Sequence, residues 1–304
     1  MVLKTAASAV GVATLLSVCA ASSAQDASVK CRVDGHLVTL AGIPEASGVA
    51  LGHGSAERLW VINDSGQPIV YSVDLEGRIA DRVRVAGAKV EDWEDLAAAP
   101  CPQGYCLYIA DIGDNRGHRS QITIYRVPEP APGADTTSPA EAFYAAYPDG
   151  SHDAEGFFVD EDGRVLIVTK DRSSTSIYRS PSAFTPGSTA KLEKVATMAN
   201  GIALAGAPGR GKGAPRAELA TGAALSADRK WIAIRSHHMV LFFRTTDVAA
   251  GRLGDPIRAE VTDAHEPQGE ALTFGPAGSI YLVGEGGKKG RPGTLTKMTC
   301  ALPR

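Results

Sequence analysis

The sequence has no surplus of charge of either sign, since 31 Lys and Arg residues face 34 Asp and Glu residues in a chain of 304. A general nucleic-acid-binding protein would show a basic surplus or a basic stripe, so the composition argues against that class. Hydrophobic residues make up 44% and charged residues 21% of the chain, which argues against collagen-like, coiled-coil and disordered proteins. We therefore expect a compact monomer with no nucleic-acid partner.

Motifs of several common enzyme and metal sites are also missing. No Gly-x-Ser-x-Gly sequence occurs, so nothing predicts an α/β-hydrolase serine. Residues 206–212 resemble the opening of a phosphate-binding loop, but Gly213 stands where a Ser or Thr would hold magnesium, and we interpret this segment as a basic surface loop. Residues 111–117 lack the spacing of an EF-hand calcium loop, and they are either a turn closed by Asp and Asn side chains or part of a ligand contact.

The N-terminal segment is typical of a secretory signal peptide covering residues 1–24. Lys4 is followed by small and apolar residues up to Ala21, and Ser22-Ser23-Ala24 offers a cleavage site. The apolar run is short and interrupted by Ser and Thr, so we expect no stable membrane insertion. We therefore expect an exported protein, periplasmic or extracellular, with a mature domain of residues 25–304.

The mature domain has an even number of cysteines. Cys101 and Cys106 flank a short loop whose Pro and Gly can bring the two thiols together, which leaves Cys31 to pair with Cys300 by elimination. Disulfides are permitted in an exported protein, whereas these spacings resemble no common zinc site. The sequence therefore predicts the disulfides Cys31–Cys300 and Cys101–Cys106.

Turn-forming residues are abundant, with 33 Gly and 18 Pro, and they separate short strands that repeat along the chain. Each repeat has a polar residue, a short strand of small and apolar residues, a turn, a strongly apolar strand ending in a polar residue, and a third strand. The aligned repeat starts are Ser47, Glu94, Glu155, Thr221 and Glu270. Their spacing of 47 to 66 residues fits a four-stranded blade, so we predict one all-β domain, a five-bladed β-propeller. A sixth blade within residues 198–220 is the alternative, although residues 201–216 read as a loop.

The chain ends supply an argument for how the ring closes. The fifth repeat lacks a fourth strand, and the segment 31–40 reads as a strand without a blade of its own. If this segment completes the fifth blade, Cys31 lies beside Cys300. A disulfide there would stabilise the fold by at most about 5 kcal/mol on the chain-entropy model.

The start of each first strand lies beside the end of the second, because these strands are antiparallel neighbours. Repeat starts and second-strand ends should therefore meet at one end of the central channel, which we call the acidic mouth. The charged residues expected there are Glu45, Asp64, Asp92, Glu94, Asp111, Asp153, Glu155, Lys170, Arg235, Glu270 and Glu285.

So many carboxylates in one opening require a neutralising partner. One hypothesis is a calcium ion, the only cofactor we consider, held by Glu94, Glu155 and Glu270 with Asp111 or Asn63. A second is a structural network in which Lys170 and Arg235 pair with the carboxylates, and a third is a metal-free catalytic carboxylate site. Further contacts to a ligand are predicted for Asp64, Asp114, Asn115, Asp153 and Glu285.

Several motifs resemble those of a family of uncharacterised exported bacterial β-propeller proteins. These motifs are Asp92-Trp93-Glu94-Asp95, Asp111-Ile112-Gly113-Asp114-Asn115, Ile124-Tyr125-Arg126-Val127-Pro128, Asp153-Ala154-Glu155-Gly156 and Thr221-Gly222-Ala223. More distantly, the repeat-start glutamates resemble those of calcium-dependent propeller lactonases, gluconolactonases and phytase-like phosphoesterases. The first resemblance implies the fold, and the second implies a channel metal that polarises a substrate.

Three functions follow as hypotheses. The first is a secreted binding or interaction propeller for a small-molecule or protein ligand, which contacts the acidic mouth and the loops 111–119 and 201–216. The second is a calcium-dependent hydrolase of phosphoesters or lactones, with Lys170 or Arg235 stabilising the oxyanion. The third is a glycosidase whose Glu155 and Glu270 would lie roughly 5 to 10 Å apart.

Overall fold

The computed structural model describes residues 27–54, 58–171, 174–183, 185–199, 219–288 and 290–303. The expected signal peptide and the loop 201–216 lie outside the described residues, as does all but the ends of the segment 198–220 in which a sixth blade was the alternative.

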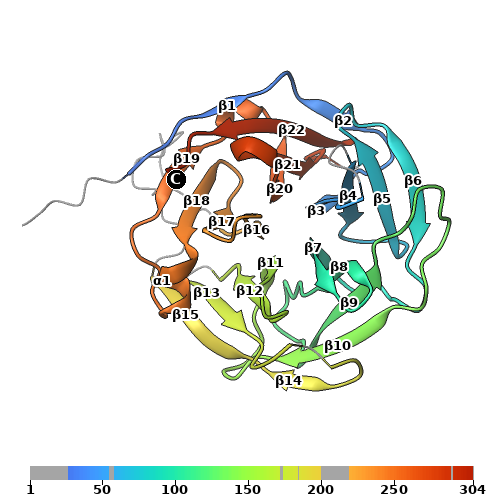
Figure 1. Cartoon of the computed structure of the whole chain (residues 1–304), viewed down its shortest axis with the longest axis vertical. Coiled ribbons are helices and arrows are strands. Elements are labelled where there is room, and N and C mark those ends of the chain that lie inside the picture. The colour runs from blue at the N-terminus through green and yellow to red at the C-terminus, as the bar shows by residue number, and fades with distance from the viewer. Residues whose placement is uncertain are drawn as a thin grey trace, which may run out of the picture.

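Five antiparallel sheets stand around a central axis as the blades of a propeller (Figure 1). Their strands are, in blade 1, β3 (Ala46–Leu51), β4 (Arg58–Asn63), β5 (Ile69–Asp74) and β6 (Ile79–Arg84); in blade 2, β7 (Trp93–Cys101), β8 (Gly104–Asp111), β9 (Ile122–Pro128) and β10 (Glu141–Ala146); in blade 3, β11 (Ala154–Val159), β12 (Val165–Thr169), β13 (Ser174–Arg179) and β15 (Glu193–Ala199); in blade 4, β16 (Gly222–Leu225), β17 (Trp231–Arg235), β18 (Met239–Arg244) and β19 (Ile257–Glu260); and in blade 5, β20 (Gln268–Phe274), β21 (Ser279–Glu285) and β22 (Gly293–Cys300). The prediction of five blades from the repeats is confirmed.

The ring closes through its two chain ends, as predicted. The N-terminal strands β1 (Cys31–Val33) and β2 (Val38–Leu40) both pair antiparallel with β22, at the outer edge of blade 5 (Figure 1). Cys31 lies directly opposite Cys300 in this pairing, and the two form a disulfide, as do Cys101 and Cys106. The segment 31–40, expected as one strand, is divided by a turn at Gly35, whose left-handed backbone (φ 93°) breaks the pairing.

Two other features were not expected. The short strand β14 (Thr189–Lys191) belongs to the connection between β13 and β15 of blade 3, yet it pairs in parallel with β10 at the edge of blade 2. It therefore ties two neighbouring blades together. A short helix, α1 (Thr245–Ala249), and the single turns η1 (Thr262–Ala264) and η2 (Pro276–Gly278) occur in connections of blades 4 and 5.

Five clusters of buried apolar side chains make up the core, one between each pair of neighbouring blades. Alternate residues of one strand enter different clusters: Val165 and Ile167 of β12 pack toward blade 2, whereas Leu166 and Val168 pack toward blade 4. Because both faces of a blade are covered, its second strand has a run of consecutive apolar residues instead of an alternating pattern. This packing leaves polar groups at the ends of the strands and near the axis.

Candidate functional site

The repeat-start residues come together because the inner strands share a backbone irregularity. The pairing of β3, β7, β11 and β20 with their second strands shifts register by one residue, as at a β-bulge. The residues at these shifts are Ser47, Glu94, Glu155 and Glu270, all less than 9% exposed. A bulge turns a side chain out of the ladder, and here it does so four times at one end of the axis. Blade 4 pairs regularly and contributes Thr221, whose buried Oγ1 has no hydrogen-bond partner.

Glu155 and Lys170 form an ion pair at the centre of the acidic mouth. Burial raises the pKa of Glu155 well above its usual range, and nearby Glu270 adds to the shift while Lys170 opposes it. The pKa of Lys170 is raised in spite of its burial, because Glu155, Glu270 and Glu94 surround the ammonium. The second carboxylate oxygen of Glu155, Oε2, is buried without a hydrogen-bond partner.

Glu270 is linked to Glu285 by an amide. Gln268 Nε2 donates hydrogen bonds to Glu270 Oε1 at 2.7 Å and to Glu285 Oε2 at 3.0 Å. Burial, with Glu270 nearby, raises the pKa of Glu285 to about 7. Burial together with the neighbouring Glu45 likewise raises the pKa of Asp64 to about 7, and Asp64 Oδ1 is buried without a hydrogen-bond partner. These carboxyl groups continue the acidic mouth toward blade 1.

Glu94 extends the cluster toward blade 2. Burial raises its pKa well above the usual range, and Glu155 and Asp92 add to the shift. The pKa of Asp92 is also raised, by burial and by Asp153. Gly113 leaves room for both carboxyl groups, since a Cβ atom there would lie 2.3 Å from Glu94 Oε1 and 2.4 Å from Asp92 Oδ2 and would displace them.

Asp111 and Asp114, by contrast, organise the loop between β8 and β9. Asp111 accepts a hydrogen bond from Arg119 Nη1 at 2.8 Å, and Asp114 accepts the backbone N–H groups of His118 and Arg119 at 2.9 and 2.8 Å. The Asp114 N–H donates in turn to Asp153 Oδ1 at 2.8 Å, and Asn115 lies exposed on the same loop. The carboxylates of Asp111 and Asp114 are thus engaged in hydrogen bonds that order this loop.

Arg235 has different partners from Lys170, although both oppose the rise that burial causes in the pKa of Glu270. Arg235 is 0% exposed and pairs with Glu266, while its Nη1 donates to the carbonyl oxygens of Ala271 at 2.6 Å and Val283 at 3.0 Å. Its guanidinium therefore joins blade 4 to blade 5.

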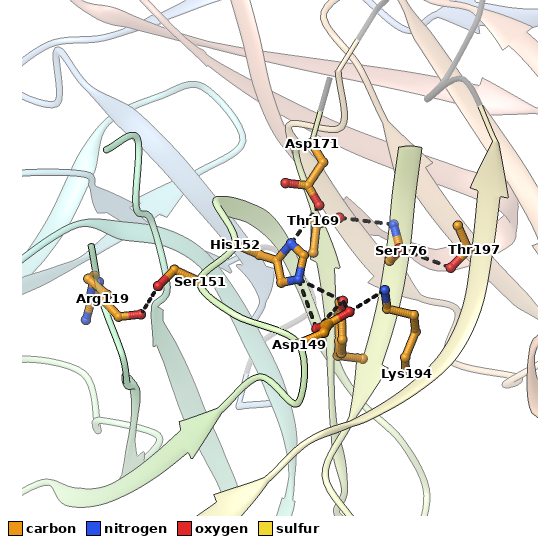
Figure 2. A network of polar contacts seen from close by, with 10 residues as sticks. Arg119, Asp149, Ser151, His152, Thr169, Asp171, Ser176, Lys194 and Thr197 are labelled. Atoms are coloured by element: carbon orange, nitrogen blue, oxygen red, sulfur yellow. Dashed lines mark hydrogen bonds and ion pairs between the residues drawn. The ribbon is translucent and has the colours of Figure 1, made fainter. Parts of the chain in front are cut away.

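A polar network in blade 3 positions the Lys170 side of the site (Figure 2). His152 directly precedes Asp153, and Asp171 directly follows Lys170. His152 Nδ1 lies 2.8 Å from Asp171 Oδ2, so this contact links the two chain segments. The other ring nitrogen lies 3.1 Å from Asp149, a carboxylate that also pairs with Lys194 at 2.5 Å (Figure 2). These bonds hold the two chain segments that bring Asp153 and Lys170 to the acidic mouth.

Sequence reasoning missed Asp95, the residue that directly follows the repeat start Glu94. In the five repeats, the residues that follow the repeat start form a layer around the axis; they are Gly48, Asp95, Gly156, Gly222 and Ala271. Small residues are needed here because the inner strands approach closely: a Cβ on Gly48 would lie 2.8 Å from the Asp95 backbone. Asp95 alone in this layer has a polar side chain, and that contrast in the aligned repeats was a signal that could have identified it.

Asp95 is 0% exposed and accepts three backbone hydrogen bonds. Their donors are Leu96 at 2.8 Å, Phe157 at 2.9 Å and Ala223 at 3.2 Å, which belong to three different inner strands. Burial raises the pKa of Asp95 well above its usual range, although the three N–H groups favour the anion. Its carboxyl group therefore joins β7, β11 and β16 across the axis.

The acidic mouth has oxygen donors of the type that calcium prefers. Over the part of the chain that the structure describes, however, no group of three or more His, Cys, Asp or Glu side chains is placed to hold a metal ion. Lys170 takes up one oxygen of Glu155, the central candidate ligand. The donor chemistry fits calcium, and the arrangement of the side chains does not.

None of the helices in the described ranges has the length and apolar character that a membrane span needs.

No protein-family model and no curated protein matches the chain. Among solved structures it is similar to the PQQ-bound aldose sugar dehydrogenase of Streptomyces coelicolor, at 11% identity and a TM-score of 0.53, over 90% of this chain and 99% of that one. It is also similar to a gluconolactonase of Xanthomonas campestris (15% identity, TM-score 0.44, 84% and 72% of the chains) and to virginiamycin B lyase of Staphylococcus aureus (10%, 0.39, 90% and 75%). At 11% identity, the likeness to the dehydrogenase supports the propeller fold alone.

Proposed function

We propose that the protein is an exported ligand-binding β-propeller whose acidic mouth binds a cationic ligand. The observation that carries this proposal is the buried Oε2 atom of Glu155, which has no hydrogen-bond partner in the middle of a cluster of carboxyl groups. Within the described chain, carboxyl groups at this end outnumber the cationic side chains. A ligand with a positive charge and hydrogen-bond donors would both offset the excess of carboxyl groups and supply a hydrogen bond to Glu155 Oε2.

The raised pKa values support the same ligand class. Asp64 and Glu285, with pKa values of about 7, still hold protons near neutral pH because their charged forms are poorly solvated and face other carboxyl groups. A bound cation would stabilise those charged forms and displace the protons. Binding should therefore tighten as the pH rises from 6 to 8.

An organic ammonium group fits better than a metal ion. The ammonium group of Lys170 already forms an ion pair with Glu155, and the charges of Glu94 and Glu270 also stabilise it. The site therefore accommodates an ammonium group. Calcium is the second candidate, since the same three glutamates offer oxygen donors, although the described side chains are not arranged around a metal ion. The calcium-dependent hydrolase and the two-carboxylate glycosidase become relevant if turnover of a phosphoester, lactone or glycoside is detected.

Calorimetric titration of the mature protein with spermidine, and separately with calcium chloride, tests the proposal at pH 7.5. We expect saturable binding of spermidine that weakens about tenfold or more in Glu155→Gln, since a charged hydrogen bond is lost. The control is Glu76→Gln, which removes a carboxylate from the exposed turn between β5 and β6 and should leave the affinity unchanged.

Binding of neither cation, or equal affinity in wild type and Glu155→Gln, would contradict the proposal. Binding of calcium alone would overturn the organic ammonium in favour of the second candidate. Assays with phosphoester and lactone substrates, with and without a chelator, would then follow. A thermal melt of each variant confirms that the fold is retained.

A further inference from the structure

The opposite end of the propeller axis has a different chemistry. All five inner strands end around a cavity of about 260 Å³. Its apolar lining includes Val49, Leu51, Leu96, Phe157 and Leu272. Leu96, Phe157 and Ala223, whose N–H groups donate to Asp95, also line it, so the Asp95 layer lies between this cavity and the acidic mouth. We call it the apolar cavity.

An aromatic pair forms one side of the apolar cavity. The rings of His53 and Tyr105 stack with their centroids 3.5 Å apart and an angle of 14° between the planes. Other contacts fix the position of both residues. The backbone N–H of His53 donates to Glu129 at 3.1 Å, and the disulfide Cys101–Cys106 closes the hairpin that carries Tyr105. Tyr105 is 42% exposed and, among the described residues, is the large hydrophobic side chain that stands out on the surface. It offers a fixed flat face to a ligand ring.

Arg229 supplies a positive charge to the same cavity. Its side chain lines the apolar cavity and also a neighbouring cavity of about 320 Å³ between blades 3 and 4. The Arg229 side chain is 39% exposed and forms an ion pair with the exposed Glu161 carboxylate, whose Oε2 lies 3.7 Å from Nη1. The Nη1 atom itself is buried and has no hydrogen-bond partner. Asp160 lines both cavities as well, but its Oδ1 accepts the N–H groups of Asp162 and Arg164 in its own turn.

The turn that carries Arg229 has a left-handed backbone position that recurs in other blades. Arg229 has a left-handed backbone (φ 58°) in the turn between the first two strands of blade 4, and its N–H donates to Ser226 O at 2.8 Å. The corresponding turn of blade 3 has Gly163 (φ 73°), whose N–H donates to Asp160 O. Glycine adopts this conformation without strain, whereas arginine does not. The corresponding turn of blade 5 has the same conformation at Ala277 (φ 55°), so the conformation belongs to the turn, and glycine should be accommodated at position 229.

We propose that the apolar cavity is a second binding site, for a small aromatic molecule that carries a carboxylate. Its ring system packs among the apolar side chains against Tyr105, and its carboxylate pairs with Arg229. Burial lowers the pKa of His53, so this imidazole is neutral at pH 7 and contributes a ring rather than a charge. The site is separate from the acidic mouth, and it takes a ligand of opposite charge.

The test compares two probes that differ only in charge, 1-naphthoate and 1-naphthamide, titrated into the mature protein. In wild type we expect 1-naphthoate to bind about tenfold or more tightly than the amide, because it gains a charged hydrogen bond. In Arg229→Gly this preference should disappear, while the melting temperature stays equal or rises because glycine suits the turn. A preference that persists in Arg229→Gly would overturn the proposal.

Further variants locate the site. Tyr105→Ala should weaken both probes by a similar factor, whereas Arg78→Gln, which removes an exposed guanidinium from the outer part of blade 1, should change neither. Glu155→Gln should leave both affinities unchanged, and this holds whether or not the acidic mouth binds a cation. Loss of 1-naphthoate binding in Glu155→Gln, or no saturable binding of either probe to wild type, would contradict the apolar cavity as the site.

Discussion

Replacing Asp95 with alanine is expected to lower the free energy of unfolding by about 4 kcal/mol, the combined effect of three buried N–H groups that lose their acceptor. The three donors belong to inner strands of blades 2, 3 and 4, so the loss falls on the contacts that hold these blades together at the axis. Little space is available for a replacement water, because the inner strands are in close contact at Gly156 and Gly222. Urea denaturation of the two proteins measures the difference.

A matched control separates this effect from the general loss of an aspartate. Asp74 also accepts two backbone N–H groups, those of Glu76 and Arg78 at 3.0 and 2.9 Å, but in an exposed turn. Water can replace it there, so Asp74→Ala should lose only about 1 kcal/mol. Asp95→Asn keeps an acceptor oxygen and should lie between the two. Equal effects of Asp95→Ala and Asp74→Ala would show that Asp95 does not join the blades.

Replacing Lys170 with methionine should destabilise the protein by about 3 kcal/mol at pH 8, because it leaves the buried carboxylate of Glu155 without its partner. At pH 5 the loss should be much smaller, since Glu155, Glu94 and Glu270 then take up protons more readily than ordinary glutamates do. Thermal unfolding of wild type and Lys170→Met at the two pH values tests this prediction. An equal loss of stability at pH 5 and pH 8 would contradict the interpretation that Lys170 compensates carboxyl groups whose pKa values are raised.

The wild type should show the same dependence in weaker form. A carboxyl group whose pKa is raised in the folded state binds its proton more tightly there than in the unfolded chain. The stability that it contributes is complete below the unfolded pKa of about 4. It is lost as the pH rises through the folded value, about 7 for Asp64 and Glu285. The melting temperature of the cation-free protein should therefore fall between pH 5 and pH 8.

The blades could be predicted from the sequence because their packing leaves a direct trace in it. A second strand covered on both faces has a run of consecutive apolar residues, as at positions 165–168 of β12, and such a run recurs once in each blade. Ring closure followed from a missing fourth strand and from the pairing of Cys31 with Cys300, both of which the structure confirms. The parallel strand β14 could not be found in this way, because three residues without a clear pattern pair with a strand of another blade.

The candidate site was predictable in its composition but not in its geometry. The repeat starts predicted that Glu94, Glu155 and Glu270 gather at one end of the axis, as they do. The β-bulges that direct them there depend on one extra residue per strand, which no local pattern reveals. The role of Asp95 was hidden for a related reason, since its three donors belong to strands up to 128 residues away along the chain.

The most direct test of the proposed function is a count of the protons released when spermidine binds. Calorimetric titrations at pH 7 in buffers of different ionisation enthalpy give this number. We expect the wild type to release protons as carboxyl groups with raised pKa ionise around the ligand, and Glu155→Gln to bind more weakly and release fewer protons. Binding without proton release, with the same affinity in both proteins, would contradict it.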